Sequence, residues 1–381
     1  MRTLRLRAAF MRGGTSKAVV FRKQDLPANP AEWDAIFLQV MGSPDPNGRQ
    51  LDGMGGGLSS LSKVCVVGPS TRPDADVDYT FAQVSVADAL VDYSGNCGNM
   101  SSAMGPFAVE EGMVAAPKDG EAVVRLHNTN TSKIIVARFP VMGGVLAPDG
   151  DLEIDGVAGR AAPIRLEFVE PGGAKSGRLL PTGAAQDVLD IPGLGAVAAS
   201  CVDAANPCVF VPAEVTGMAG VELPAELETN AVFLDRMENI RRAASVRMGL
   251  APDIDAAARI PSIPKVAMVC APKPASTLSG RALAASEMDI CIRMISVGQP
   301  HRAVPITGAI CLAVAARVPG TIAHGLCRAS SGPIRIGHPS GTILVDAGVA
   351  EVPGGSVKAE YGAVYRSARR LFEGAVLYRS D

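Results

Sequence analysis

Residues 94–112 constrain the fold more than any other part of the chain, because a loop of small residues continues there directly as a helix. Apolar side chains recur along this stretch at helical spacing and share one side. Gly112 suits the left-handed residue that ends many helices, and Asn96 or Asn99 can cap the first turn. The stretch therefore predicts a helix with one buried side and an open, polar mouth.

The mouth of this expected helix has the composition of a site for a small anion. Gly95 and Gly98 carry no Cβ, so a ligand can approach the backbone. Free N–H groups from Asn96 to Asn99 and the positive end of the helix dipole favour a carboxylate. The same field favours the thiolate form of Cys97. The structural alternative is an ordinary helix start with an inert, buried cysteine.

The totals of the chain limit its class. A length of 381 residues is too great for one ordinary core and about right for two domains. Hydrophobic residues make up 48% and charged residues 19%, so disorder is not expected. The net charge of −2 argues against a nucleic-acid partner. No apolar run resembles a signal core or could span a bilayer, so we expect a soluble, cytoplasmic protein without a membrane partner.

Neither the eight cysteines nor the four histidines form a recognisable metal site. The cysteines are scattered without a CxxC pair, and several lie in apolar runs. This pattern predicts reduced thiols rather than disulfides. The histidines show no metal-ligand spacing, so we expect no bound metal.

The first of two notable loops near the N-terminus is Met11–Lys17. It contains Gly-Gly-Thr-Ser-Lys, which lacks the residue order of a Walker phosphate loop. We interpret it as a tight turn that presents backbone N–H groups, Ser16, and Lys17 or Arg12 to an anion. The alternative is a plain hairpin turn with solvated charges.

The second loop, Asp52–Lys63, is rich in glycine and hydroxyl residues and ends in a lone lysine. It is not a dinucleotide fingerprint, because Leu58 stands where glycine is required and no strand precedes the loop. The apolar strand Val64–Val67 follows at once. Partial burial of Lys63 at this junction favours the neutral amine, which can act as a base. The alternative is a surface lysine at the start of a strand.

Strands dominate the first half of the chain, with two helices among them. This order predicts an α+β fold in which a curved sheet wraps around a helix, rather than alternating βαβ units. Residues 171–183 are rich in glycine and proline and form the expected boundary between an N-terminal domain, 1–183, and a C-terminal domain, 184–367. A C-terminal strand at about 368–381 is expected to return to the first domain.

The second half loosely repeats the first. Residues 298–319 again lead from a loop into a helix, which is apolar nearly all round from Ala309 to Ala316 and should be buried. This second central helix is expected to begin at Thr307, and its mouth offers Arg302, Thr307 and Gly308 to a second carboxylate. The other expected helices are at 30–41 and 230–248. The other expected strands are at 4–10, 18–21, 77–86, 89–93, 122–128, 133–140, 152–154, 164–168, 206–211, 266–270 and 288–296. Closing strands are expected at 334–336, 342–345, 349–352 and 363–378, the last of these with a final helical turn.

Seven motifs occur in order along nearly the whole chain: Met11–Lys17, Met41–Pro46, Asp52–Gly57, Ser62–Lys63, Asp92–Asn99, Pro181–Gly183 and Gly337–Thr342. Together they resemble the 2-methylaconitate cis-trans isomerase (PrpF) family, which includes 3-methylitaconate and 4-oxalomesaconate isomerases. The resemblance implies a fold similar to diaminopimelate epimerase, with two pseudo-symmetric domains, each a β-barrel-like sheet around a central helix. It also implies that no cofactor is needed. A homodimer is expected by analogy with such enzymes.

Carried over by position, the resemblance places the catalytic lysine at Lys63 and the site cysteine at Cys97. The epimerase has a cysteine at each helix mouth. Here the second mouth reads Ile306–Ala309, and the nearest thiol, Cys311, lies inside the helix. A symmetric mechanism with two thiols is therefore not expected.

The resulting hypothesis is an isomerase that transfers an allylic proton, or interconverts cis and trans forms, in an unsaturated tricarboxylate. The first choice of substrate is 2-methylaconitate, and the alternatives are 3-methylitaconate and 4-oxalomesaconate. Lys63 would remove the proton, and Cys97 would donate one or line the cavity, while helix N-termini stabilise the dienolate. The competing hypotheses are a cysteine-based epimerase, a non-catalytic carboxylate-binding protein, and a pyridoxal-phosphate enzyme with a Schiff base at Lys63.

Overall fold

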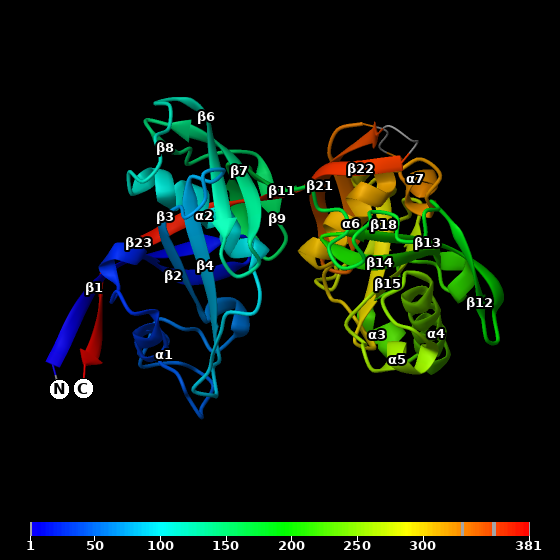
Figure 1. Ribbon diagram of the computed structural model, residues 1–381, viewed down its shortest axis with the longest axis horizontal. Coiled ribbons are helices and arrows are strands. Elements are labelled where there is room, and N and C mark those ends of the chain that lie inside the picture. The colour runs from blue at the N-terminus through cyan, green and yellow to red at the C-terminus, as the bar shows by residue number, and fades with distance from the viewer. Residues whose placement is uncertain (1, 329–330, 353–355, 381) are drawn as a thin grey trace. The chain divides into compact units, whose positions relative to one another are not determined.

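The computed structural model describes residues 2–328, 331–352 and 356–380, in which the chain forms two compact units. The first unit holds the chain up to Glu167 together with the C-terminal segment from Tyr365. The second unit is Phe168–Val364. Figure 1 shows strands and a few helices in both units, so the mixed α and β architecture predicted from the sequence is confirmed.

The first unit is built on one sheet. Its main strands lie in the order β23 (Ala368–Ser380), β1 (Arg2–Gly13), β2 (Ser16–Arg22), β3 (Lys63–Pro69), β4 (Val77–Val84), β6 (Gly120–Asn128) and β7 (Lys133–Met142). The β2–β3 and β4–β6 pairs are parallel, and the other pairs are antiparallel. A helix is inserted between the two members of each parallel pair, as a crossover connection requires. The shorter strands are β5 (Val91–Asp92), β8 (Val145–Leu146), β9 (Leu152–Ile154), β10 (Val157–Ala161) and β11 (Ile164–Val169).

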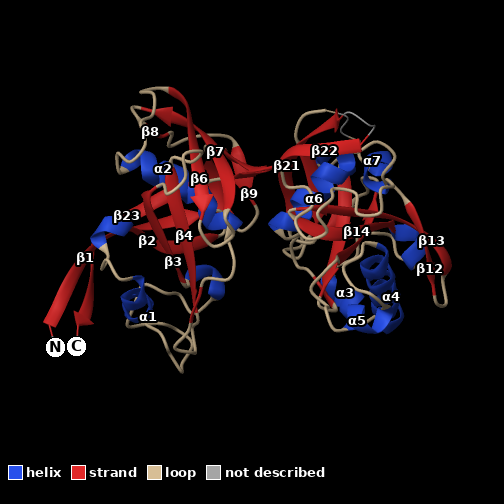
Figure 2. Cartoon of the chain, in the orientation of Figure 1, coloured by secondary structure: helices blue, strands red, loops and turns tan. Residues whose placement is uncertain are grey.

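Helix α2 (Gly98–Glu110) is the central element of this unit. It contacts strands from β1 and β23 at one end of the strand order to β7 and β8 at the other, and Figure 2 shows strands on several sides of it. Every residue from Met100 to Val109 is buried. Gly105 permits the close approach, because a Cβ there would lie 2.9 Å from the side chains of Ala137 and Phe139. The predicted helix is confirmed.

Helix α1 (Trp33–Met41) follows the 3-10 turn Pro30–Glu32 and packs on the residues of the sheet that point away from α2. The ring of Phe37 stacks on that of Phe21, which belongs to β2, with 5.9 Å between the ring centroids. The helix predicted at 30–41 is therefore confirmed, with its first turn in the tighter 3-10 form.

The two ends of the described chain pair with each other. Strands β1 and β23 run antiparallel along their length, with Arg2 opposite Ser380, and Figure 1 shows the N and C ends side by side. The last helical turn expected within 363–378 is wrong, because β22 (Ser356–Arg366) and β23 occupy that segment. Pairing with distant strands overrides the local pattern there. Asp381 lies outside the described residues.

The second unit has its own sheet. Its main strands lie in the order β12 (Asp187–Ile191), β13 (Gly195–Ala204), β14 (Asn206–Pro212), β15 (Lys265–Cys270), β18 (Ile290–Ser296), β20 (Ile334–His338), β21 (Gly341–Val352) and β22. The β14–β15 and β18–β20 pairs are parallel, and the others are antiparallel. The sequence analysis did not predict β12, a short strand with two aspartates, or β13, in which four of ten residues are alanine. The shorter elements are α3 (Pro224–Glu228), α5 (Ile254–Ala258), α7 (Ile322–Leu326), β16 (Ala275–Ser276), β17 (Ala282–Leu283) and β19 (Gln299–Pro300).

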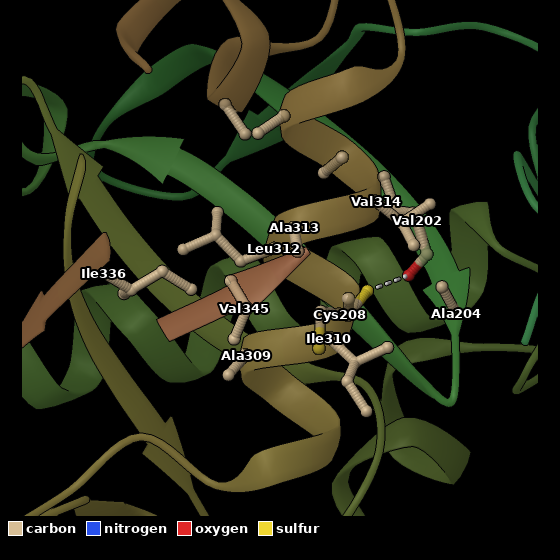
Figure 3. Packing of buried hydrophobic residues seen from close by; sticks show 14 of the residues in the cluster. Val202, Ala204, Cys208, Ala309, Ile310, Leu312, Ala313, Val314, Ile336 and Val345 are labelled. Atoms are coloured by element: carbon tan, nitrogen blue, oxygen red, sulfur yellow. Dashed lines mark hydrogen bonds between the residues drawn. The ribbon is translucent and has the colours of Figure 1, made fainter. Parts of the chain in front are cut away.

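Helix α6 (Ile306–Arg317) forms the core of the second unit. Its residues from Gly308 to Ala316 are all buried, which confirms the burial predicted from its composition. Figure 3 shows apolar side chains of the surrounding strands packed against it, among them Val202 and Val345. The Cys311 thiol donates to the Val202 carbonyl oxygen at 3.4 Å, so this cysteine is part of the core.

The other face of the second sheet carries α4 (Ala231–Arg247), which confirms the helix predicted at 230–248. All eight cysteines are free. No helix within residues 2–328, 331–352 and 356–380 is long and apolar enough to cross a bilayer.

Candidate active site

The mouth of helix α2 begins at Cys97, which is the N-cap residue and has an extended backbone. The expectation that Asn96 or Asn99 caps the helix is wrong, since no side chain makes a capping hydrogen bond. The first intrahelical bond runs from the Ser101 N–H to the Cys97 carbonyl oxygen at 2.9 Å. The N–H groups of the helix residues before Ser101 therefore have no acceptor within the helix. They can donate hydrogen bonds to a ligand.

The two asparagines have tertiary partners instead. The Asn96 side-chain oxygen accepts from the Ser101 hydroxyl and from the Asn128 amide, both at 3.3 Å. The Asn99 amide donates to the Thr15 hydroxyl at 3.1 Å. Asn99 therefore fixes the start of the helix against the turn between β1 and β2.

That turn approaches the helix closely because it contains two glycines. A Cβ on Gly13 would lie 2.5 Å from the Asn99 carbonyl oxygen, and one on Gly14 would lie 2.2 Å from the Asn99 side-chain oxygen. Ser16 follows and is buried, whereas the Lys17 ammonium lies over the ring of Phe10 at 5.6 Å. Consecutive residues of β2 point to opposite faces, so Ser16 and Lys17 do not share one face of the sheet.

Arg366 is a residue of this mouth that the sequence analysis missed. Its Nε donates to the Asn99 side-chain oxygen at 3.1 Å, and its Nη1 donates to the Tyr365 carbonyl oxygen at 2.9 Å. Burial lowers the pKa of Arg366 to about 10, and the nearby Cys97 thiol acts in the opposite direction. A guanidinium beside the mouth can bind a carboxylate. No local signal points to it, because only the pairing of β23 with β1 brings it there.

Lys63 is the first residue of β3 and is only 7% exposed. Its ammonium donates to the side-chain oxygen of Gln83 and lies 5.2 Å from the centroid of the Phe81 ring. The Gln83 amide nitrogen donates to the carbonyl oxygens of Ser62 at 2.9 Å and Ser59 at 3.0 Å. The Gln83 side-chain oxygen is therefore free to accept the hydrogen bond from Lys63. Because Lys63 is buried, this oxygen takes the place of bulk water as its partner.

The buried thiol of Cys65 interacts electrostatically with both Lys63 and Cys97. Burial raises the pKa of Cys65, the Cys97 thiol raises it further, and Lys63 acts to lower it. Burial and the thiols of Cys65 and Cys97 also raise the pKa of Tyr79. The Tyr79 hydroxyl is buried and has no hydrogen-bond partner within the described residues. Lys63 and Cys97 thus both act on the pKa of Cys65, whereas of these two residues only Cys97 acts on Tyr79.

Three of the predicted site residues lie in the second unit, around the start of α6. Arg302 is exposed, and its carbonyl oxygen accepts from the Ser340 hydroxyl at 2.6 Å. Thr307 and Gly308 belong to the first turn of α6, whose N-cap is Pro305. A Cβ on Gly308 would lie 2.6 Å from the sulfur of Met294, so this glycine is required for close packing of helix and strand.

A metal-binding cluster of three or more histidine, cysteine, aspartate or glutamate residues is absent from the part of the chain that the structure describes. The groups described at the mouth of α2 are the Cys97 thiol, the Arg366 guanidinium and backbone N–H groups, and the Lys63 amine interacts with the neighbouring Cys65. Such a set can bind carboxylates and move protons.

Comparison with known proteins places the whole chain in one family. The family model described as PrpF protein matches residues 3–379. The chain belongs to the PrpF family. It is 40% identical to the 2-methyl-aconitate isomerase of Shewanella oneidensis, over 98% of this chain and 96% of that protein. It is 41% identical to the 3-methylitaconate isomerase of Eubacterium barkeri, over 98% of this chain and 97% of that protein.

A solved structure of the family shares this fold. The crystal structure of a methylitaconate-delta-isomerase superimposes with a TM-score of 0.90 at 40% sequence identity. The superposition covers 99% of this chain and 96% of that one. The motifs that resembled the PrpF family in the sequence therefore identified it correctly.

Proposed function

We propose that this PrpF-family chain is a cofactor-independent isomerase that transfers an allylic proton in an unsaturated polycarboxylate. The observation that carries the proposal is the full-length similarity to relatives named as isomerases of 2-methyl-aconitate and 3-methylitaconate. The first substrate to test is 2-methylaconitate. Since the identities to these two relatives differ by only one percentage point, 3-methylitaconate is tested beside it, together with 4-oxalomesaconate.

The carboxylates of the substrate would bind at the mouth of α2. The support is the set of N–H groups from Gly98 onward that lie outside the helical ladder, with the Asn99 side chain and the Arg366 guanidinium beside them. These donors also favour the negative charge that develops on a carboxylate when a neighbouring carbon loses a proton. We retain Ser16 as a further contact of this site. Arg302, Thr307 and Gly308 would serve a carboxylate at the start of α6.

Lys63 is proposed as the base and Cys97 as the second group. In the proposed step, the Lys63 amine takes a proton from the allylic carbon, and the electron pair of that C–H bond enters a dienolate. A proton then returns to the other end of the allyl system, or to the same carbon after rotation about the former double bond. The buried position of Lys63, with one amide oxygen as hydrogen-bond acceptor, supports this role.

The two units are proposed to be pseudo-symmetric domains. The support is the common order of pairings: antiparallel β1–β2, parallel β2–β3 and antiparallel β3–β4 in one unit, and β13–β14, β14–β15 and β15–β18 in the same sense in the other. In each unit a helix also connects the next two strands, which are parallel. Domain boundaries near residue 183, a homodimer and a cytoplasmic location remain predictions.

Proton NMR in heavy water with a panel of aconitate-like acids tests the proposal. The expected result is isomerisation of 2-methylaconitate or one of the two alternatives, with incorporation of solvent deuterium. Binding without exchange would favour a carboxylate-binding protein. Deuterium uptake at the α-carbon of an amino acid would favour a cysteine-based epimerase, and either outcome would contradict the proposal.

A further inference from the structure

Two cysteines of the second unit, Cys270 and Cys291, lie directly opposite each other on neighbouring strands. Cys270 is the last residue of β15, and Cys291 is its partner in the antiparallel register with β18. Residues in such a pair lie about 4.5–5.5 Å apart at Cα, and their side chains share one face of the sheet. That face carries α4, since both cysteines belong to the core cluster that packs against this helix.

This arrangement of the two cysteines matches what a disulfide requires. A disulfide joins residues whose Cα atoms are about 4.4–6.8 Å apart and whose Cβ atoms do not point away from each other. Both cysteines are free thiols here, and the Cys270 side chain hydrogen-bonds to that of Cys291. The bond can therefore form without a rearrangement of the strands.

The two thiols differ in acidity. The hydrogen bond from Cys270 lowers the pKa of Cys291 to about 7, and the Lys273 backbone and the Arg293 charge act in the same direction, whereas burial acts to raise it. The same hydrogen bond and burial raise the pKa of Cys270. The thiolate is the form of cysteine that attacks an oxidant. Cys291 is therefore the thiol that reacts first, and Cys270 is placed to attack the product.

A second pair of neighbouring thiols, Cys208 and Cys311, provides the contrast. Cys208 lies on β14 and Cys311 lies within α6, so no strand register aligns them. Burial and the hydrogen bond to Cys208 raise the pKa of Cys311, and its thiol donates to a backbone carbonyl oxygen. This pair is expected to stay reduced.

The cover over Cys270 is thin. Gly220 packs against it so closely that a Cβ on Gly220 would lie 2.7 Å from the Cys270 sulfur. Gly220 has no side chain, and its neighbour Ala219 is exposed, as is Ala271, which follows Cys270 at the end of β15. Strand ends open more readily than the centre of a sheet. An oxidant as small as hydrogen peroxide can therefore reach the thiols from this end of the strand.

We infer that Cys270 and Cys291 form a redox-active thiol pair, which a small peroxide converts to a disulfide. The Cys291 thiolate attacks one oxygen of hydrogen peroxide, the O–O bond breaks, hydroxide leaves, and Cys291 becomes a sulfenic acid. The Cys270 sulfur then attacks the Cys291 sulfur, the S–O bond breaks, and water leaves with the Cys270 proton. The two thiols lose two electrons and two protons in all, and the peroxide is reduced to two molecules of water. A thiol reductant reverses the oxidation.

Peptide mapping of the full chain after treatment with hydrogen peroxide tests the inference. The chain is then unfolded, and its remaining free thiols are alkylated. Trypsin releases Val266–Arg281 and Ala282–Arg293, each with one cysteine, because it does not cut between Lys273 and the proline that follows. We expect these two peptides to be linked, with a mass lower than their sum by two hydrogen atoms, and a thiol reductant should separate them.

The other cysteines serve as internal controls in the same digest. The peptides of Cys208 and Cys311 should remain alkylated. Unlinked peptides of Cys270 and Cys291, at a peroxide dose that already oxidises the partly exposed Cys97, would overturn the inference. Equal linkage of Cys208 to Cys311 would overturn it as well, because the strand register would then not decide the reaction.

Two serine variants separate the roles of the two thiols. In Cys270→Ser the hydroxyl keeps the hydrogen bond to Cys291, but no thiol can attack the sulfenic acid. Dimedone, a reagent for sulfenic acids, should label Cys291 in this variant at least about tenfold more than it labels Cys270 in Cys291→Ser, because the thiolate fractions near pH 7 differ by that factor or more. Cys201→Ser is the control, since Cys201 is a buried cysteine of the same cluster, and it should form the link like the parent chain. Labelling of Cys291 in the parent chain as strong as in Cys270→Ser would show that Cys270 does not complete the bond, and would overturn the inference.

Discussion

The side-chain oxygen of Asn99 accepts a hydrogen bond from Nε of Arg366 at 3.1 Å, although 267 positions separate the two residues in the chain. Asn99 lies in the first turn of α2, and Arg366 ends the strand that precedes β23. The contact places a guanidinium at the mouth of the central helix of the first unit. It makes Arg366 the candidate partner for a substrate carboxylate.

Replacing Arg366 with methionine should therefore weaken substrate binding more than the chemical step. We expect Arg366→Met to raise KM about 10- to 100-fold, because a charged hydrogen bond is lost, with a smaller change in kcat. Steady-state kinetics with 2-methylaconitate give both constants. Arg369→Met is the control, since Arg369 is an exposed residue of β23 nearby. A fall in kcat with unchanged KM would contradict the role in binding.

Removing the hydroxyl of Tyr79 should not destabilise the fold. This hydroxyl is buried without a partner in the described chain, so Tyr79→Phe removes an unsatisfied group and should raise the free energy of unfolding by about 1 kcal/mol. Tyr93→Phe is the contrasting variant, because the Tyr93 hydroxyl donates to Asp34 at 2.6 Å, and it should lose about 0.5–1.5 kcal/mol. Urea denaturation measures both. A clear loss in Tyr79→Phe would show that the hydroxyl has a bound partner.

His301 should make the fold less stable in weak acid. Burial and the charge of Lys265 lower its pKa to about 4 in the folded chain, against 6.5 for an unperturbed histidine, so the unfolded state binds the proton first as the pH falls. The stability that the neutral ring contributes is present above pH 6.5 and is lost between about pH 6.5 and 4. His301→Gln should flatten the pH dependence of the unfolding free energy in this window by about 2–3 kcal/mol. Parallel curves for the two proteins would refute the assignment.

Cys97→Ser separates the roles of the thiol and the amine. If Lys63 is the base, a hydroxyl at position 97 can still line the site and bond to the substrate, so we expect kcat to fall by about tenfold or less. Single-turnover kinetics at saturating substrate measure this step. A loss of about a thousandfold or more would instead assign the base role to Cys97.

Local patterns in the sequence predicted the helix and the strand that carry the site. The features that the sequence analysis did not predict depend on contacts between distant segments of the chain. Helix α2 followed from apolar spacing and Gly112, and Lys63 from the meeting of a glycine-rich loop with an apolar strand. The capping prediction for Asn96 and Asn99 was wrong because Asn128, Thr15 and Arg366 engage those side chains. A cap preference is local, whereas these partners are brought together only by strand pairing.

The missed hairpin of β12 and β13 has a similar cause. β13 contains four alanines and β12 is only five residues long with two aspartates, so local propensity gives little signal. Their position depends on pairing with β14 and on packing against α4 and α6. A strand at about 368–381 was expected to return to the first domain, but Arg366 was missed because no local feature indicates that its side chain meets Asn99.

The rate of deuterium incorporation into 2-methylaconitate in heavy water, compared between the parent chain and Lys63→Met, tests the central claim most directly. Lys133→Met is the control, because Lys133 is also the first residue of a strand but is exposed. The account predicts that Lys63→Met loses about 100-fold or more of the exchange rate and that Lys133→Met exchanges like the parent. Tricarballylate, a saturated tricarboxylate that has no allylic proton to exchange, should still bind to Lys63→Met. Exchange at the parent rate in Lys63→Met would show that another group removes the proton.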